Sequence, residues 1–131
     1  MTPELLALLA LVLVQLATLV AYAIIGNLQL GPRITLSPRD HVPPLSPLLG
    51  RLQRALANGV EALALFTPTI LVVTLSGHAS PLTAIAAWAY VATRVAYVPA
   101  YVFGLVPWRS IIWTLGLVCI TVLLAKAILG P

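Results

Sequence analysis

Long runs of apolar residues, separated by short polar segments, dominate the sequence. A helix needs about 20 mostly apolar residues to cross the hydrocarbon core of a bilayer. Four segments reach this length, and none has the strict alternation of a barrel strand. The pattern therefore predicts four membrane-spanning helices, at residues of about 4–25, 53–76, 82–104 and 109–129.

The polar segments between these runs differ in length. Residues 26–50 form the one long connection, and the five prolines within it exclude a continuous helix. The second and third spans are joined by a tight turn at residues 76–80, and the third and fourth meet at residues 104–107. Because short connections make neighbouring helices antiparallel, we expect residues 1–131 to form one all-α domain, an integral membrane up-down bundle of four helices.

Composition supports a membrane protein and excludes a soluble globular enzyme. Apolar residues make up 61% of the 131 residues and charged residues only 8%, whereas soluble domains carry about 25% charged residues. The single cysteine, Cys119, excludes an intrachain disulfide framework and a multi-cysteine metal site, so we expect no metal. The net charge of +4 is not gathered on a water-exposed face, so nucleic acid is not an expected partner.

The distribution of the arginines predicts the orientation in the membrane. Positively charged residues favour cytoplasmic loops, and the opposite ends of the spans hold only Glu4, His78 and Lys126. We therefore expect the first and third connections to be cytoplasmic and both termini to be outside. The arginines in or beside these two connections are Arg33, Arg39, Arg51, Arg54 and Arg109.

Two of the predicted spans carry polar side chains at helical spacing. At about 100° per residue, the polar positions of the second span fall within an arc of about 80°, and those of the third within about 60°. Polar side chains within a membrane are costly, and they usually face the bundle interior and serve a function there. The two stripes are Arg51, Arg54, Asn58 and Glu61 in the second span, and Tyr90, Arg94, Tyr97 and Tyr101 in the third.

The charges of this region favour an anionic ligand. Arg54, Arg94 and Arg109 outnumber Glu61, and an excess of buried positive charge attracts an anion. A structural ion pair between Glu61 and an arginine of a neighbouring helix is an open alternative. Proton-coupled export by Glu61 fits less well, because this carboxylate shares its stripe with two arginines. Trp113, near the start of a helix, fits an interfacial aromatic belt.

The two polar stripes and Arg109 fall into two motifs. They are Arg51-x-x-Arg54-Ala55-x-x-Asn58-x-x-Glu61 in the second span, and Arg94-x-x-Tyr97-x-x-x-Tyr101 followed by Arg109. These motifs resemble those of the MAPEG family, membrane-associated proteins of eicosanoid and glutathione metabolism, and the similarity covers the whole chain. The second motif, with its Tyr-Val-Pro-Ala-Tyr segment at 97–101, looks more like the bacterial branch of the family, which implies a bacterial inner (plasma) membrane.

The resemblance implies a homotrimer that binds glutathione between neighbouring subunits. By motif position, Arg109 matches the arginine that stabilises the glutathione thiolate, which is reasonable because a guanidinium lowers the pKa of a nearby thiol from about 8.5. The implied activity is that of a glutathione-dependent transferase or peroxidase acting on lipophilic electrophiles from the bilayer. The residues implied to bind glutathione are Arg51, Arg54, Asn58, Glu61, Arg94, Tyr97 and Tyr101.

A second function stays open on the same residues. Some members of the family bind lipids without conjugating them, so the inter-subunit pocket could serve a non-catalytic binder of a lipid or an acidic metabolite. The expected partners are therefore further copies of this chain, membrane lipids and a lipophilic small molecule.

Overall fold

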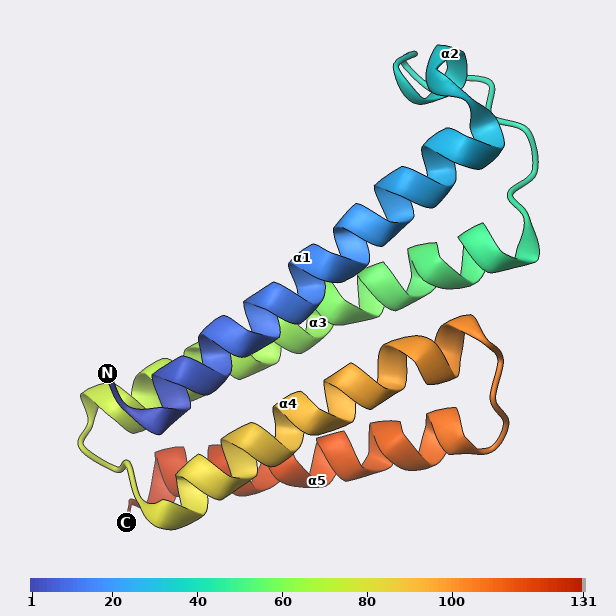
Figure 1. The fold of residues 1–131 in the computed structure, drawn as a ribbon. Helices are drawn as coiled ribbons and strands as arrows, with labels where there is room; N and C mark the ends of the chain where they lie inside the picture. The colour runs from blue at the N-terminus through green and yellow to red at the C-terminus, as the bar shows by residue number, and fades with distance from the viewer. Residues whose placement is uncertain (131) are drawn as a thin grey trace.

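The computed structural model describes residues 1–130, and most of them lie in helices (Figure 1). No strand is present in residues 1–130, so the predicted all-α class is confirmed. A short helix, α2 (Pro32–Thr35), follows the first long helix. The long helices are α1 (Pro3–Leu30), α3 (Pro47–Leu75), α4 (Pro81–Val102) and α5 (Trp108–Leu129).

Capping residues explain where three of these helices begin. Thr2, Ser46 and Ser80 each accept a hydrogen bond from a backbone N–H in the first turn of their helix. Each is followed by a proline, which lacks a backbone N–H, at a position where the helix has no partner for one. The Ser46–Pro47 cap lets α3 begin at Pro47, ahead of the membrane span predicted at about 53–76. The helix therefore takes in the polar residues ahead of the apolar run.

The connection between α1 and α3 is shorter than its polar composition suggests. Helix α1 continues through residues 26–30 and ends at Gly31, which has a φ of 80° that favours glycine. After α2, residues 36–46 follow an irregular path to α3. The predicted connection at 26–50 is thus partly helical at both of its ends.

The helices pack as two neighbouring pairs. Helix α1 lies against α3, α4 lies against α5, and α1–α4, α3–α4 and α3–α5 contacts join the pairs (Figure 1). At the centre, the ring of Phe66 stacks on that of Tyr90, with centroids 4.8 Å apart. The core cluster also draws on every long helix, including Ala7, Leu11, Ile70, Ala87, Ile120 and Leu123.

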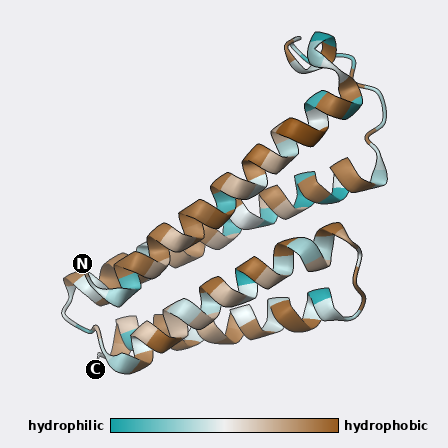
Figure 2. Ribbon diagram, viewed as in Figure 1, coloured by the Kyte–Doolittle hydropathy of each residue, from teal (hydrophilic) through white to brown (hydrophobic). Residues whose placement is uncertain are grey.

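The outer faces of the helices are strongly apolar. Figure 2 shows hydrophobic residues along most of their length, and Leu13 and Ile85 are 64% and 68% exposed. Helices α1, α3 and α5 are long and apolar enough to cross a membrane. Helix α4 has the same length as α5, but Arg94 and its tyrosines lower its hydropathy. Two points remain predictions: that α4 also crosses the membrane, and that both termini lie outside.

A polar contact joins α1 and α3 midway along their length. The side-chain amide of Gln15 donates a hydrogen bond to the backbone oxygen of Leu56 at 2.9 Å. Gly59 makes room for this amide, because a Cβ atom at position 59 would overlap with it. Glycine is therefore favoured at position 59 only when the Gln15 side chain occupies this space.

We predict that the effect of Gly59→Ala on the free energy of unfolding depends on Gln15. Alanine is favoured over glycine in a helix by about 1 kcal/mol, but here its methyl group displaces the Gln15 amide and breaks a hydrogen bond worth about 1 kcal/mol. The substitution should be close to neutral in the parent and stabilising by about 1 kcal/mol in a Gln15→Ala background. Reversible unfolding in detergent measures both, and equal effects in the two backgrounds would contradict this contact.

Candidate ligand-binding site

The polar stripes of α3 and α4 face each other, as helix geometry predicts. One guanidinium nitrogen of Arg94 donates to the side-chain oxygen of Asn58 at 2.9 Å. The Nε of Arg54 donates to the Tyr101 hydroxyl at 3.1 Å. These two contacts bring four of the predicted site residues together.

Arg94 is the buried member of this group. Its side chain is only 5% exposed, and its guanidinium carbon lies 4.3 Å from the centre of the Tyr97 ring. Tyr97 is itself buried. A cation held over an aromatic face is stabilised by the ring quadrupole, most strongly where water is excluded. Tyr97 and Asn58 thus both compensate the charge of Arg94.

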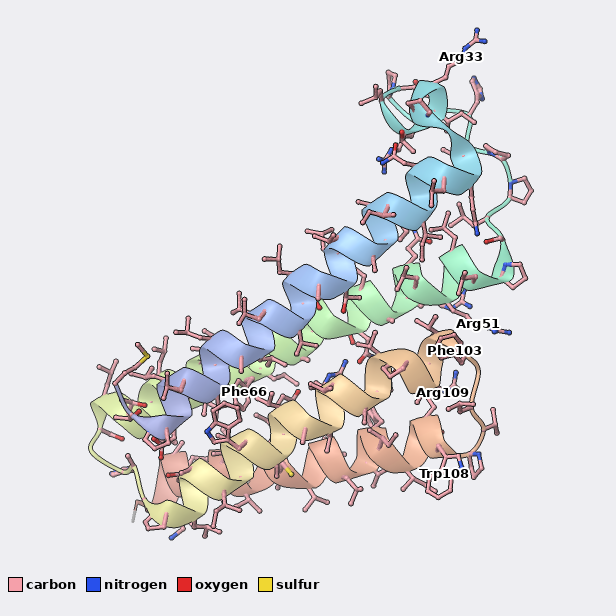
Figure 3. The ribbon with its side chains drawn as sticks, viewed as in Figure 1. Arg33, Arg51, Phe66, Phe103, Trp108 and Arg109 are labelled. Carbon is pink, nitrogen blue, oxygen red and sulfur yellow. The ribbon has the colours of Figure 1, made fainter. Side chains whose placement is uncertain are left out.

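The remaining arginines of the motifs lie toward one end of the bundle, close to the α4–α5 connection. Figure 3 shows Arg51 and Arg109 at this end, near Phe103. A guanidinium nitrogen of Arg51 donates to the backbone oxygen of Val102 at 3.4 Å. The guanidinium carbon of Arg109 lies 5.0 Å from the centre of the Tyr101 ring, and the Arg109 side chain is exposed.

Most of the predicted site residues line two adjoining cavities. The smaller, of about 110 Å³, lies among α3, α4 and α5 and is lined by Asn58, Glu61 and Arg94. The second, of about 480 Å³, is lined by Tyr97, Tyr101 and Arg109. Trp113 borders both. The predicted residues therefore gather around two cavities that share Trp113, whereas Arg51 and Arg54 line neither cavity.

Several residues of α5 in this region were not predicted as site residues. Trp113, expected in an interfacial belt, lines both cavities, and Ser110 and Thr114 accompany Arg109 in the second. Gly116 lets α5 approach α4 closely, since a Cβ atom there would lie 3.0 Å from the Thr93 hydroxyl. The signal in the sequence is the helical spacing of Trp113 and Gly116, four and seven residues after Arg109, which places these two residues on the same face of α5 as Arg109.

An apolar cavity continues from the smaller polar one. It has a volume of about 510 Å³ and lies between α3 and α5. Leu65, Leu117 and Ile120 line both cavities. A path bordered by apolar side chains thus leads from Glu61 and Arg94 along the two helices.

Positive charge exceeds negative charge in the region. Arg94 and Arg109 line the two cavities and Arg54 contacts Tyr101 beside them, whereas Glu61 is the one acidic residue of the lining among those described. The Glu61 side chain is exposed and its carboxylate forms no hydrogen bond or ion pair within residues 1–130. The structural ion pair considered from the sequence is therefore not formed within the described chain.

The length and hydropathy of the helices define an integral membrane protein. A model of the MAPEG family matches residues 6–129, and the chain belongs to this family, which confirms the resemblance of its motifs. Comparison with curated proteins and with solved structures found no match.

Proposed function

We propose that the protein is a glutathione-dependent transferase or peroxidase that acts on lipophilic electrophiles. The observation that carries the proposal is the convergence of Asn58, Glu61 and Arg94 on one cavity, with Arg109 in the adjoining one. Glutathione has two carboxylates, one ammonium group and one thiol. The Asn58 amide and the excess of positive charge from the arginines suit the carboxylates, Glu61 suits the ammonium group, and family membership supports this pairing.

In this proposal, Arg109 prepares the thiol for reaction. Its guanidinium favours the thiolate over the thiol, and the released proton passes to water. In conjugation, the sulfur forms a bond to an electrophilic carbon while the leaving group departs with the bonding electrons. In peroxide reduction, the thiolate attacks the O–O bond to give a sulfenic acid and an alcohol, and a second glutathione converts the sulfenic acid to a disulfide and water.

The apolar cavity offers a binding place for the lipophilic partner. Its lining comes almost entirely from apolar residues of α3 and α5, and it meets the polar cavity at Leu65, Leu117 and Ile120. A hydrophobic electrophile that enters from the bilayer can thus approach a thiolate held near the arginines without crossing water.

We further propose that the protein is a homotrimer with its ligand bound between subunits. Arg54, Glu61 and Arg109 are exposed in the single chain, so one side of the site is open for a neighbour to cover. Native mass spectrometry from a mild detergent should therefore show trimers. Spectra containing only monomers or dimers would contradict this assembly.

A non-catalytic binder of a lipid or an acidic metabolite is the second candidate function. The apolar cavity is larger than the polar cavity beside it, about 510 Å³ against about 110 Å³. In addition, Ala62 follows the motif glutamate, where conjugating members of the family often carry an aromatic residue. Both features favour a long apolar ligand over a small electrophile.

An activity assay separates the two candidates. Purified protein in lipid nanodiscs, supplied with glutathione and a chromogenic aryl halide, should conjugate them with saturation in both substrates. Arg33→Ala is a matched control, since Arg33 is an exposed arginine of α2 outside the cavities, and it should leave the rate unchanged. Glutathione binding without turnover would support the non-catalytic binder instead.

A further inference from the structure

Arg94 and Asn58 form the one hydrogen bond between side chains that both line the smaller cavity. Their contact is 2.9 Å long and joins a guanidinium nitrogen to the side-chain oxygen of Asn58. Arginine has five N–H donors and no acceptor. The Asn58 atom beside Arg94 must therefore be the oxygen and not the amide nitrogen. The amide nitrogen of Asn58 then takes the other position.

We propose that Arg94 is a positioning residue that orients the Asn58 amide, so that its NH₂ group is offered to the ligand as a donor. Arg94 is buried, and its guanidinium carbon also lies 4.3 Å from the centre of the Tyr97 ring. It can therefore hold the oxygen of Asn58 in one orientation. The NH₂ group of Asn58 donates no hydrogen bond within residues 1–130, which leaves it available to a ligand.

This orientation determines which ligand groups the cavity accepts. Asn58 supplies a donor, and Glu61, almost one turn later on the same helix, supplies an acceptor into the same cavity. A ligand held by both residues therefore presents a hydrogen-bond acceptor beside Asn58 and a hydrogen-bond donor beside Glu61. The inference rests on the proposed function, because it takes glutathione as the ligand. In it, Arg94 affects the ligand through Asn58 and not by contacting the ligand itself.

A double-mutant cycle on glutathione affinity tests the positioning role. Arg94→Met removes the donors while keeping an unbranched side chain, and should weaken binding about 2- to 10-fold, as expected when one side chain must be ordered on binding. In an Asn58→Ala background the same substitution should have no further effect. Equal losses in the two backgrounds would show that Arg94 acts on the ligand directly and would overturn the proposal.

Asn58→Asp supplies a second variant that keeps the acceptor facing Arg94. It replaces the NH₂ donor with a carboxylate oxygen, so glutathione binding should fall at least about 10-fold while the fold is retained. Binding at the parental affinity would mean that the Asn58 nitrogen does not meet the ligand. Arg94→Lys, which keeps a charged donor, should recover part of the affinity lost in Arg94→Met.

A thermal melt without ligand separates this proposal from the proposed function. Asn58→Asp should raise or preserve the melting temperature when Arg94 is present, because the new carboxylate meets a guanidinium. In the Arg94→Met background it should lower the melting temperature, because the carboxylate is left unpaired. If the parent fails to bind glutathione, the proposed function fails. If the melts show no such coupling, the Arg94–Asn58 contact fails, whatever the ligand.

Discussion

Replacing Arg109 with alanine is expected to lower the rate of conjugation at neutral pH by about 10- to 30-fold, with little change in glutathione affinity. Without a nearby guanidinium the bound thiol returns toward a pKa of about 8.5, where only a few per cent is thiolate at pH 7. Arg109 can supply this effect because it lines a cavity with Tyr97 and Tyr101 and is held close to the Tyr101 ring.

The pH dependence of this loss distinguishes thiol activation from binding. Loss of the cation raises the thiol pKa, so the deficit of the variant is largest at and below neutral pH. It shrinks as the pH rises past the new pKa, because the thiol then ionises unaided. A pH–rate profile measures this change, alongside the ultraviolet absorbance of the bound thiolate. Arg33→Ala, the matched control, should follow the parent, and a deficit of Arg109→Ala that stays constant across pH would contradict the role.

Glu61→Gln is expected to weaken glutathione binding by about 10- to 100-fold. A hydrogen bond to a charged group is typically worth about 1.5–3 kcal/mol, and the substitution removes the charge while keeping the shape. Glu61 lines the smaller cavity and is exposed in the single chain, so its carboxylate is free to receive an ammonium group. Calorimetric titration of the variant against the parent measures the loss.

A melt of the same variant separates a ligand contact from a structural role. Because Glu61 has no ion pair within residues 1–130, the free energy of unfolding should change by less than about 0.5 kcal/mol. Glu4→Gln is the contrasting control: Glu4 is 1% exposed and accepts a hydrogen bond from Thr83 at 2.7 Å. That variant should alter stability and spare binding. A Glu61→Gln protein that is much less stable but binds glutathione normally would show that Glu61 has a structural role and does not contact the ligand.

The sequence alone predicted which polar residues of α3 and α4 share a face of their helix. Helical periodicity is enough to place Asn58 and Glu61 on one side of α3, and Arg94 and Tyr97 on one side of α4. It does not determine how far the helices slide along each other, and this offset decides that Arg94 meets Asn58 and that Arg54 meets Tyr101. Those pairs required the three-dimensional packing.

Other contacts were not predicted, because the position of each residue in its own helix already explained why that residue type is there. Glu4 suits the first turn of α1 by its charge alone, which concealed its buried contact with Thr83, 79 positions away. Trp113 suits an aromatic belt, and only the approach of α5 to α3 and α4 turns it toward the cavities. Helix α3 also begins before the apolar run that predicts its span, since the cap at Ser46 lies outside that run.

Titration of the purified protein with glutathione in nanodiscs tests the central claim most directly. The account predicts saturable heat with one site per subunit, retained in Arg33→Ala and strongly weakened in Glu61→Gln. No saturable heat at millimolar glutathione in the parent, or equal affinity in the parent and Glu61→Gln, would contradict a glutathione site in this cavity.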